Sequence, residues 1–203
     1  MTNVGIINYG GGNLRSLTRA VESLGYSVTM VEHPSALEGL THLLYPGQGA
    51  YGDCLRKIRD KGLEEAIRQW IQQDKPFFGI CVGYQLLFAG SEEAEGLKGF
   101  SLIEGDIVKF PEERLKVPHM GWNSLQIKDP SLSIWQGLPE NPYFYFVHSY
   151  YSEGVDESFS AGTCDYGKPF TACVAKGNLI ATQFHPEKSQ ANGLKLLKNF
   201  LEM

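Results

Sequence analysis

The stretch that decides the fold is Phe77-Phe78-Gly79-Ile80-Cys81-Val82-Gly83-Tyr84-Gln85-Leu86-Leu87-Phe88. A short apolar run leads to Cys81, glycines stand two residues away on either side, and a helical pattern follows at once. This pattern predicts a nucleophile elbow, a tight turn from strand to helix, with cysteine where serine is usual. Because such a turn strains the backbone, glycine at positions 79 and 83 removes side chains that would clash there.

The elbow would expose the sulfur of Cys81 at the N-terminal end of a helix. Unpaired amides and the helix dipole favour thiolate over thiol at that place. The amide of Val82 would be positioned to donate to an oxyanion. The alternative is a buried structural cysteine before a core helix, since Gly-x-Cys-x-Gly also recurs by accident.

Composition limits the class of protein. The 203 residues fit one α/β domain, residues 1–203, and 42% hydrophobic residues allow a sizeable core. A net charge of -5 argues against nucleic-acid binding, and the apolar runs are too short for a membrane span. The start of the chain lacks the features of a signal peptide.

The number and spacing of the cysteines bear on the redox compartment of the protein and on whether it binds a metal. The four cysteines are scattered without metal-ligand spacing, which favours free thiols in a reducing cytoplasm and no bound metal. Apart from Cys81, they are expected to be small core residues: Cys54, Cys164 and Cys173.

The two halves of the chain differ in pattern. In the first half, apolar strands alternate with helices; strands are expected at 4–8, 27–31, 43–45 and before Cys81, and helices at 14–24, 53–60 and 63–73. The second half has short strand-like segments at 106–110, 122–127, 143–147, 159–163, 171–175 and 178–184, then a helix at 192–200 whose inner stripe is Leu194, Leu197 and Leu201. Lys176-Gly177-Asn178 is typical of a hairpin turn. We therefore expect a mostly parallel central sheet flanked by helices, with additional antiparallel strands from the second half.

Two glycine-rich loops follow strands of the first half. Tyr9-Gly10-Gly11-Gly12-Asn13 lacks the dinucleotide fingerprint and the P-loop Lys-Ser/Thr pair, so a tight loop is favoured over a phosphate site. In Pro46-Gly47-Gln48-Gly49, two glycines would let the backbone swing an amide toward a ligand. Because carboxyl ends of parallel strands share one edge, this loop and Cys81 could face one crevice; an ordinary turn is the alternative.

A second chemical signal is Gln183-Phe184-His185-Pro186-Glu187-Lys188-Ser189. In extended chain, His185 and Glu187 project to the same side. A carboxylate beside an imidazole fixes its tautomer and stabilises the imidazolium, so Cys81, His185 and Glu187 would supply nucleophile, base and orienting group. Without the elbow, a surface histidine capped by a carboxylate would explain the pair.

These motifs together resemble a known family. Gly-x-Cys-x-Gly-x-Gln with a distal His-Pro-Glu is similar to the class I (triad) glutamine amidotransferases. Further segments resemble the glutaminase subunits of imidazole glycerol phosphate synthases, from histidine biosynthesis: Pro118-His119-Met120-Gly121-Trp122-Asn123, Phe146-Val147-His148-Ser149-Tyr150 and the segment from Gln183 to Ser189. The resemblance spans nearly the whole chain and implies a three-layer, flavodoxin-like α/β fold.

The resemblance also implies a reaction. Cys81 would attack the side-chain amide of L-glutamine, and His185, oriented by Glu187, would protonate the departing ammonia and then activate water. The oxyanion would be held by the backbone amides of Val82 and Gln48. Ammonia would pass to a (βα)₈-barrel cyclase subunit in a heterodimer, which forms imidazole glycerol phosphate and an aminoimidazole carboxamide ribotide. No cofactor and no metal are implied.

By the same match, further residues receive roles. Substrate contacts are expected from Gly47, Gly49, Gln85, Glu93, Ser149 and Tyr150, and a partner-facing position for Asn13, Trp122, Tyr145 and Lys188. From the residues alone, the two aromatics could instead belong to the core, and the lysine could be a solvated charge. His148 is expected to be structural, and His33, His42 and His119 have no assignable partner.

Three positions depart from the usual family pattern. Gln48 stands where valine is usual, Val82 where leucine is usual, and Tyr84 where methionine is usual. Positions 48 and 82 would act through backbone amides, so their side chains need not stop catalysis. Tyr84 could alter the glutamine pocket or the contact with the partner.

Three other functions compete with this interpretation. A paralogue could serve another acceptor, such as a sugar nucleotide; a non-catalytic scaffold could keep the fold; and a cysteine peptidase could use the same sheet. The intact Cys81, His185 and Glu187 argue against the scaffold. No feature favours peptides over glutamine.

Overall fold

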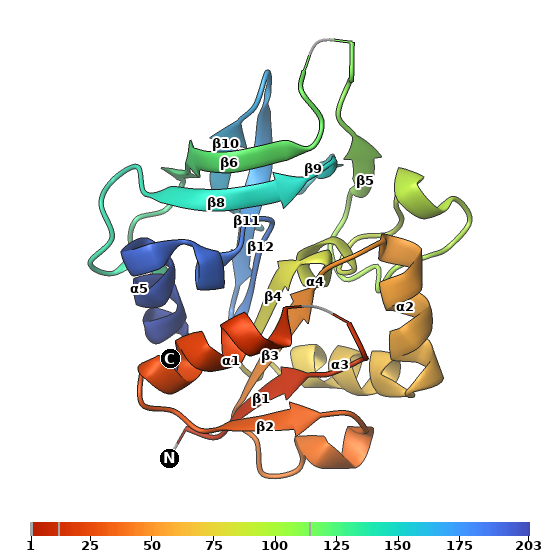
Figure 1. Ribbon diagram of the computed structural model, residues 1–203, viewed down its shortest axis with the longest axis vertical. Coiled ribbons are helices and arrows are strands. Elements are labelled where there is room, and N and C mark those ends of the chain that lie inside the picture. Colours follow the sequence, from red (N-terminus) through yellow and green to blue (C-terminus); the bar gives the residue numbers. More distant parts are fainter. Residues whose placement is uncertain (1, 12, 114) are drawn as a thin grey trace.

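Figure 1 shows the computed structural model of the protein, which describes residues 2–11, 13–113 and 115–203. Gly12, part of the predicted loop before the first helix, lies outside the described residues. Among the residues that are described, no helix combines the length and the apolar character needed to cross a membrane.

The centre of the fold is a parallel sheet, as predicted. Its strands pair in the order β2 (Val28–Val31), β1 (Val4–Ile7), β3 (His42–Gly47), β4 (Phe77–Cys81) and β12 (Leu179–Thr182). Every residue of β1, β3, β4 and β12 is buried, because helices cover both faces of the sheet. Continuous apolar runs rather than alternation are therefore the sequence signal of these strands.

Helices flank this sheet on both sides (Figure 1). The helix α1 (Leu14–Ser23) joins β1 to β2, whereas α2 (Tyr51–Asp60) and α3 (Leu63–Gln72) join β3 to β4. The connection from β1 to β2 runs toward one edge of the sheet, and the connection from β3 to β4 runs toward the other. Because both connections are right-handed, α1 lies on one face of the sheet and α2 and α3 lie on the other. The closing helix α5 (Gln190–Leu201) packs beside α1.

The second half extends the sheet with antiparallel strands. β11 (Pro169–Lys176) pairs with β12, with β10 (Ser160–Asp165) and with β9 (Tyr150–Glu153). The edges are completed by β5 (Asp106–Lys109) on β9 and by β7 (Gln126–Ile127) on β10. The predicted hairpin turn is confirmed, since Lys176 pairs with Leu179 and Gly177 has φ 57°. β6 (His119–Ser124) and β8 (Tyr143–His148) form a separate antiparallel ribbon.

Several predicted elements differ from the structure. The segment 122–127 is divided between β6 and β7, the strand β9 was not predicted, and β3 runs on through Pro46 to Gly47. The helix after Cys81, α4 (Val82–Gln85), is one turn long. Single 3₁₀ turns occupy Pro34–Leu37, Glu92–Ala94, Ser133–Trp135 and Pro186–Lys188.

The predicted inner stripe of the last helix is wrong at one position. Leu194 is 36% exposed, while Leu196, Leu197 and Phe200 of α5 are buried. The cause lies at Gly193, where a Cβ atom would come within 1.8 Å of the carbonyl oxygen of Pro186. This close approach turns Gly193 toward the protein and therefore turns the neighbouring Leu194 outward.

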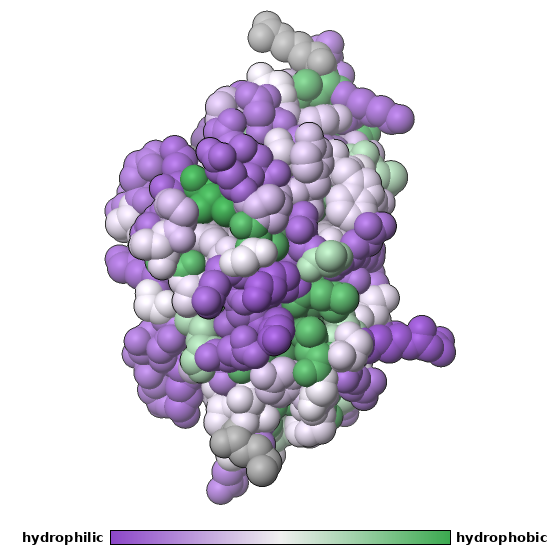
Figure 2. Space-filling view, turned by 90° about the vertical axis from the view of Figure 1, so that its left-hand side faces the viewer, coloured by the Kyte–Doolittle hydropathy of each residue, from purple (hydrophilic) through white to green (hydrophobic). Residues whose placement is uncertain are grey.

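The apolar surface divides into a large core and scattered exposed residues. All four cysteines are free and buried, which confirms the core positions predicted for Cys54, Cys164 and Cys173. Figure 2 shows one face of the molecule, on which hydrophobic residues form small patches between polar ones. The exposed large hydrophobic side chains are Met30, Met120, Trp122, Tyr143, Leu194 and Met203.

Candidate active site

Cys81 is the last residue of β4 and stands at a strained turn. Its backbone has φ 55° and ψ −107°, and the helix α4 begins at the next residue. A Cβ atom at Gly83 would lie 2.1 Å from the carbonyl oxygen of Tyr45, so only glycine allows this approach of α4 to β3. The nucleophile elbow predicted from the sequence is therefore present.

The carboxyl ends of neighbouring strands converge on this turn. Gly47 pairs with Cys81 across β3 and β4, and Thr182 pairs with Ile80 across β12 and β4. The residues that follow β12 consequently emerge next to the sulfur. Open parallel sheets bind ligands at this edge, near the place where the strand order reverses, here between β1 and β3.

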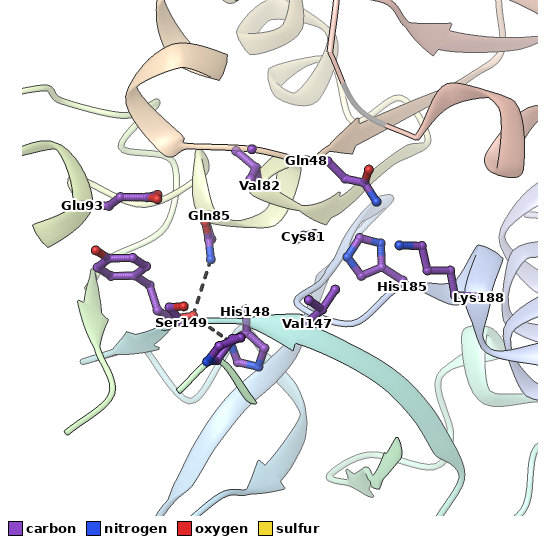
Figure 3. Close-up of a pocket in the computed structure, with 13 residues that line it drawn as sticks. Gln48, Cys81, Val82, Gln85, Glu93, Val147, His148, Ser149, His185 and Lys188 are labelled. Carbon is purple, nitrogen blue, oxygen red and sulfur yellow. Dashed lines mark hydrogen bonds between the residues drawn. The ribbon is translucent and has the colours of Figure 1, made fainter. Parts of the chain in front are cut away.

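A cavity of 390 Å³ opens in front of Cys81 (Figure 3). Cys81 itself is only 6% exposed, so the cavity supplies the approach to its sulfur. Many of the predicted site residues line it: Gln48, Gly49, Cys81, Val82, Gln85, Glu93, Ser149, Tyr150, His185 and Lys188. The lining does not include Gly47, Glu187, Asn13, Trp122 or Tyr145.

His185 and Glu187 form a buried pair. His185 Nδ1 lies 2.9 Å from Glu187 Oε1, and both side chains are almost fully buried. Nδ1 donates to the carboxylate, which leaves Nε2 without a hydrogen-bond partner among the described residues, and Figure 3 shows the ring beside Cys81. Nε2 is thus the ring atom that is free to act on the sulfur, and the role of His185 as a general base stays a prediction.

The charge state of His185 follows from its neighbours. Burial by itself lowers the pKa of His185, but the neighbouring Cys81 and the bonded carboxylate of Glu187 together raise it to about 10. This direction is expected for an imidazolium that is bonded to a carboxylate. His185 and Glu187 are therefore arranged as an ion pair and not as two neutral groups.

The opposite wall of the cavity carries polar groups for a ligand. Glu93 Oε2 accepts the N–H of Tyr51 at 2.8 Å, the first residue of α2, which fixes this carboxylate at a helix N-terminus. Gln85 Nε2 donates to the carbonyl oxygen of Tyr150 at 3.5 Å. Figure 3 shows Glu93 and Gln85 across the cavity from His185 and Lys188.

The backbone amide of Gln48 is engaged elsewhere. It donates to Tyr9 Oη at 3.3 Å, and the sulfur of Cys54 lies 3.4 Å from Tyr9 Oη and 3.6 Å from the carbonyl oxygen of Gln48. The peptide must therefore rotate away from Tyr9 before this amide can stabilise an oxyanion. Gly49, with φ 107°, supplies backbone freedom beside it. The oxyanion roles of Gln48 and Val82 stay predictions.

The residues predicted to face a partner lie outside the cavity, except Lys188. Trp122 is 46% exposed and packs edge-to-face against Tyr145, with ring centroids 6.2 Å apart; Lys188 Nζ lies 6.0 Å from the ring centroid of Tyr145. Trp122 is therefore not a core aromatic. Asn13 caps α1 by accepting the N–H of Ser16 at 3.4 Å. Their contact with a partner stays a prediction.

His119, to which no partner could be assigned from the sequence, is hydrogen-bonded in the structure. His148 Nδ1 lies 2.7 Å from the carbonyl oxygen of Tyr150, so it must donate there and its Nε2 must accept. His119 Nδ1, 2.9 Å from that Nε2, is then the donor, and His119 Nε2 accepts from Asn123 Nδ2 at 3.3 Å. His148 itself also lines the cavity, and this chain of neutral imidazoles anchors the neighbouring segment at Tyr150; a structural role for His148 stays a prediction.

This histidine pair makes stability dependent on pH. Burial lowers the pKa of His119 to about 4 and that of His148 to about 3, below the ordinary value of 6.5. The unfolded state therefore binds more protons, so the neutral pair stabilises the fold above about pH 6.5, and this contribution is lost as the pH falls toward 4 and 3. We expect a loss of about 2 kcal/mol per histidine between pH 7 and pH 4.5, measured by urea unfolding.

Two variants test whether the loss of stability at low pH comes from His119 and His148. His119→Phe keeps an aromatic ring against Tyr166 and should weaken the dependence of unfolding free energy on pH, while the exposed His33→Gln should keep it. An unchanged pH dependence in His119→Phe would contradict the buried neutral pair.

Sequence reasoning missed several residues of the site. Tyr9, Pro118, Val147 and Gln183 received no role, although Pro118 and Val147 line the cavity and Gln183 contacts Cys81. One signal was available for Gln183. It stands two residues before His185, so its side chain projects to the same side of extended chain.

Fold and site together define a class of α/β protein in which a thiol at a strand end faces a buried imidazole–carboxylate pair. A sequence model described as "Glutamine amidotransferase class-I" matches residues 5–203. The chain belongs to this family.

Similar proteins narrow the comparison. The chain is 45% identical over 209 residues to the imidazole glycerol phosphate synthase subunit HisH of Geobacter sulfurreducens, covering 100% of both chains. It is 44% identical over 210 residues to the protein of the same name from Methylococcus capsulatus, covering 99% of this chain and 96% of that one. A crystal structure described as a glutamine amidotransferase superimposes with a TM-score of 0.77 at 21% identity, covering 98% of this chain and 97% of that chain, and confirms the predicted fold.

Proposed function

We propose that this chain hydrolyses L-glutamine to glutamate and ammonia and passes the ammonia to a synthase subunit in histidine biosynthesis. The observation that carries the proposal is the cavity in which Cys81 and His185, whose ring is bonded to Glu187 behind it, share the lining with a fixed carboxylate, Glu93. Its relatives are named as subunits of imidazole glycerol phosphate synthase, which supports a synthase subunit as the acceptor of the ammonia.

The proposed reaction has two halves. The thiolate of Cys81 attacks the side-chain carbonyl carbon of glutamine, and the resulting oxyanion is held by backbone amides at Val82 and Gln48. The C–N bond then breaks as imidazolium His185 gives its proton to the leaving ammonia. In the second half His185 takes a proton from water, the hydroxide attacks the thioester, and glutamate leaves with the thiolate restored.

The cavity offers groups for each end of glutamine. Glu93 is a carboxylate suited to the α-ammonium group, and Ser149 and Tyr150 also line the cavity. Gly47, which pairs with Cys81, and Gly49, which lines the cavity, place backbone groups beside the turn at Cys81. The Gln48 peptide, held by Tyr9 in this structure, rotates when the complete complex forms, so turnover depends on the partner.

The partner is a (βα)₈-barrel cyclase subunit in a heterodimer. Exposed Trp122 and half-buried Tyr145 and Lys188 form an aromatic–cation cluster beside the cavity that suits the proposed contact. Asn13 caps the N-terminus of α1, in the loop that follows the carboxyl end of β1, and we assign it to the same contact. As part of the same proposal, residues 1–203 form one domain, and the chain works in the reducing cytoplasm, where its four buried thiols stay free.

Glutaminase assays with and without the partner test this proposal. We expect glutamate release by the chain alone to be slow and to rise by at least about tenfold with the barrel subunit and its nucleotide ligand. Ammonia should then be consumed in synthesis rather than accumulate. Equal glutamate release with and without this partner would contradict the proposed acceptor; stimulation by a different synthase would assign the chain to a paralogous pathway.

A further inference from the structure

Gln183 is a buried polar residue to which the reaction above gives no role. It follows β12 directly, is fully buried, and its backbone N–H donates to the carbonyl oxygen of Ala172 at 2.9 Å. Its position is thus fixed by the sheet. A buried amide side chain needs hydrogen-bond partners, and the identity of those partners indicates what the residue does.

Both partners of the Gln183 side chain belong to the cavity. Nε2 of Gln183 lies 3.8 Å from Cys81 Sγ and donates to it, and Oε1 accepts from Gln85 Nε2 at 3.0 Å. Gln85 in turn donates to the carbonyl oxygen of Tyr150. The amide of Gln183 therefore connects the nucleophile with the wall that we assign to the substrate.

The orientation of this amide is determined by Gln85. Gln85 presents its NH₂ group to Gln183, so Gln183 must present its oxygen in return. The opposite rotamer would place two NH₂ groups against each other and an oxygen against the sulfur. Exchange of O and N is therefore unfavourable, and the Gln183 NH₂ group stays directed at Cys81.

We propose that Gln183 is a catalytic residue that stabilises the Cys81 thiolate and holds its sulfur in line with His185. The inference rests on the proposed function. The amide neither accepts nor releases a proton; its effect is a charge-assisted hydrogen bond to an anion across a buried contact. Gln183 is also hydrogen-bonded to Gln85. A ligand that moves the Gln85 side chain would therefore also change the hydrogen bond from Gln183 to the sulfur of Cys81.

Gln183→Met provides the direct test, because it keeps the length and shape of the side chain and removes the donor. The measurement is the rate of Cys81 alkylation by iodoacetamide as a function of pH, located by mass spectrometry in the purified full chain. We expect the pH of half-maximal alkylation to rise by about 1 unit, which corresponds to a tenfold loss of thiolate stabilisation. Gln183→Glu, which adds a repelling negative charge, should raise it further.

Steady-state kinetics give a second readout. In the complex with its partner, Gln183→Met should lower kcat for glutamine by about 10- to 100-fold, the range for loss of one hydrogen bond to a charged group. KM should change less than kcat, while synthesis from added ammonia remains. Gln183→Asn, which keeps the amide but is one methylene too short, should show the same shift in alkylation and so covers the case in which the methionine variant does not fold.

A matched control separates this role from simple burial of an amide. Asn199 is also a buried amide, bonded to the carbonyl oxygens of Ile134 and Gln136, and none of these residues lines the cavity. Asn199→Leu should lower stability and leave the alkylation profile unchanged. Gln183 variants that fold and keep the wild-type alkylation profile would overturn the inference. A wild-type chain without glutaminase activity would instead overturn the proposed function, since alkylation of Cys81 needs no glutamine.

Discussion

Replacing Cys81 with alanine is expected to abolish glutamine-dependent turnover, by at least about 10⁴-fold, and to leave ammonia-dependent synthesis by the complex intact. The reason is chemical. Without the sulfur no thioester forms, and the His185–Glu187 pair has no nucleophile to serve. Ammonia supplied from solution bypasses this step and reaches the partner directly.

The control for Cys81→Ala is Cys173→Ala. Cys173 is a free cysteine that is fully buried in β11, and burial raises the pKa of its thiol. This substitution should lower stability modestly and keep glutamine hydrolysis. Both variants are assayed for glutamate release and for synthesis from ammonium salt. Glutamine hydrolysis that survives in Cys81→Ala would refute the role of the elbow.

The second large effect is expected from Glu187→Gln, which should lower kcat for glutamine by about 10²- to 10⁴-fold. The amide keeps the shape of the side chain but removes the charge that orients the His185 imidazolium. Because Glu187 raises the pKa of His185, its loss lowers that pKa. The alkaline limb of the pH–rate profile, where His185 loses its proton, should therefore move to lower pH.

Rate measurements from pH 6 to pH 10.5 reveal this shift. Glu140→Gln, an exposed carboxylate in the loop before β8, controls for the loss of one negative charge and should leave the profile in place. A Glu187→Gln enzyme with normal kcat, or with an unmoved alkaline limb, would show that the carboxylate does not act through His185.

Patterns that depend on local chemistry could be predicted from the sequence. The strained turn at Cys81 follows from glycine spacing, because Gly83 must fit against the carbonyl oxygen of Tyr45. The parallel core follows from apolar runs that alternate with helices. His185 and Glu187 could be paired because they stand two residues apart, although the structure joins them through the 3₁₀ turn Pro186–Lys188 and not through extended chain.

Features set by partners distant in the chain could not be predicted. The segment 122–127 has one alternating pattern, yet Trp122 pairs with β8 and Ile127 with β10, and periodicity does not specify a neighbour. Leu194 fits a helical stripe as well as Leu196, and the packing of Gly193 against Pro186 decides between them. The direction of the Gln48 amide is a backbone torsion that residue type does not encode.

The most direct test of the central claim is to identify the residue that forms the covalent bond with the substrate. A glutamine analogue that carries an electrophilic carbon in place of its amide should label the wild-type complex once, on Cys81, and inactivate glutamine hydrolysis at the same rate. Cys54, Cys164 and Cys173 should remain unlabelled. Glutamine hydrolysis that persists with Cys81 fully labelled, or inactivation that follows labelling of another residue, would contradict a thiolate nucleophile at this turn.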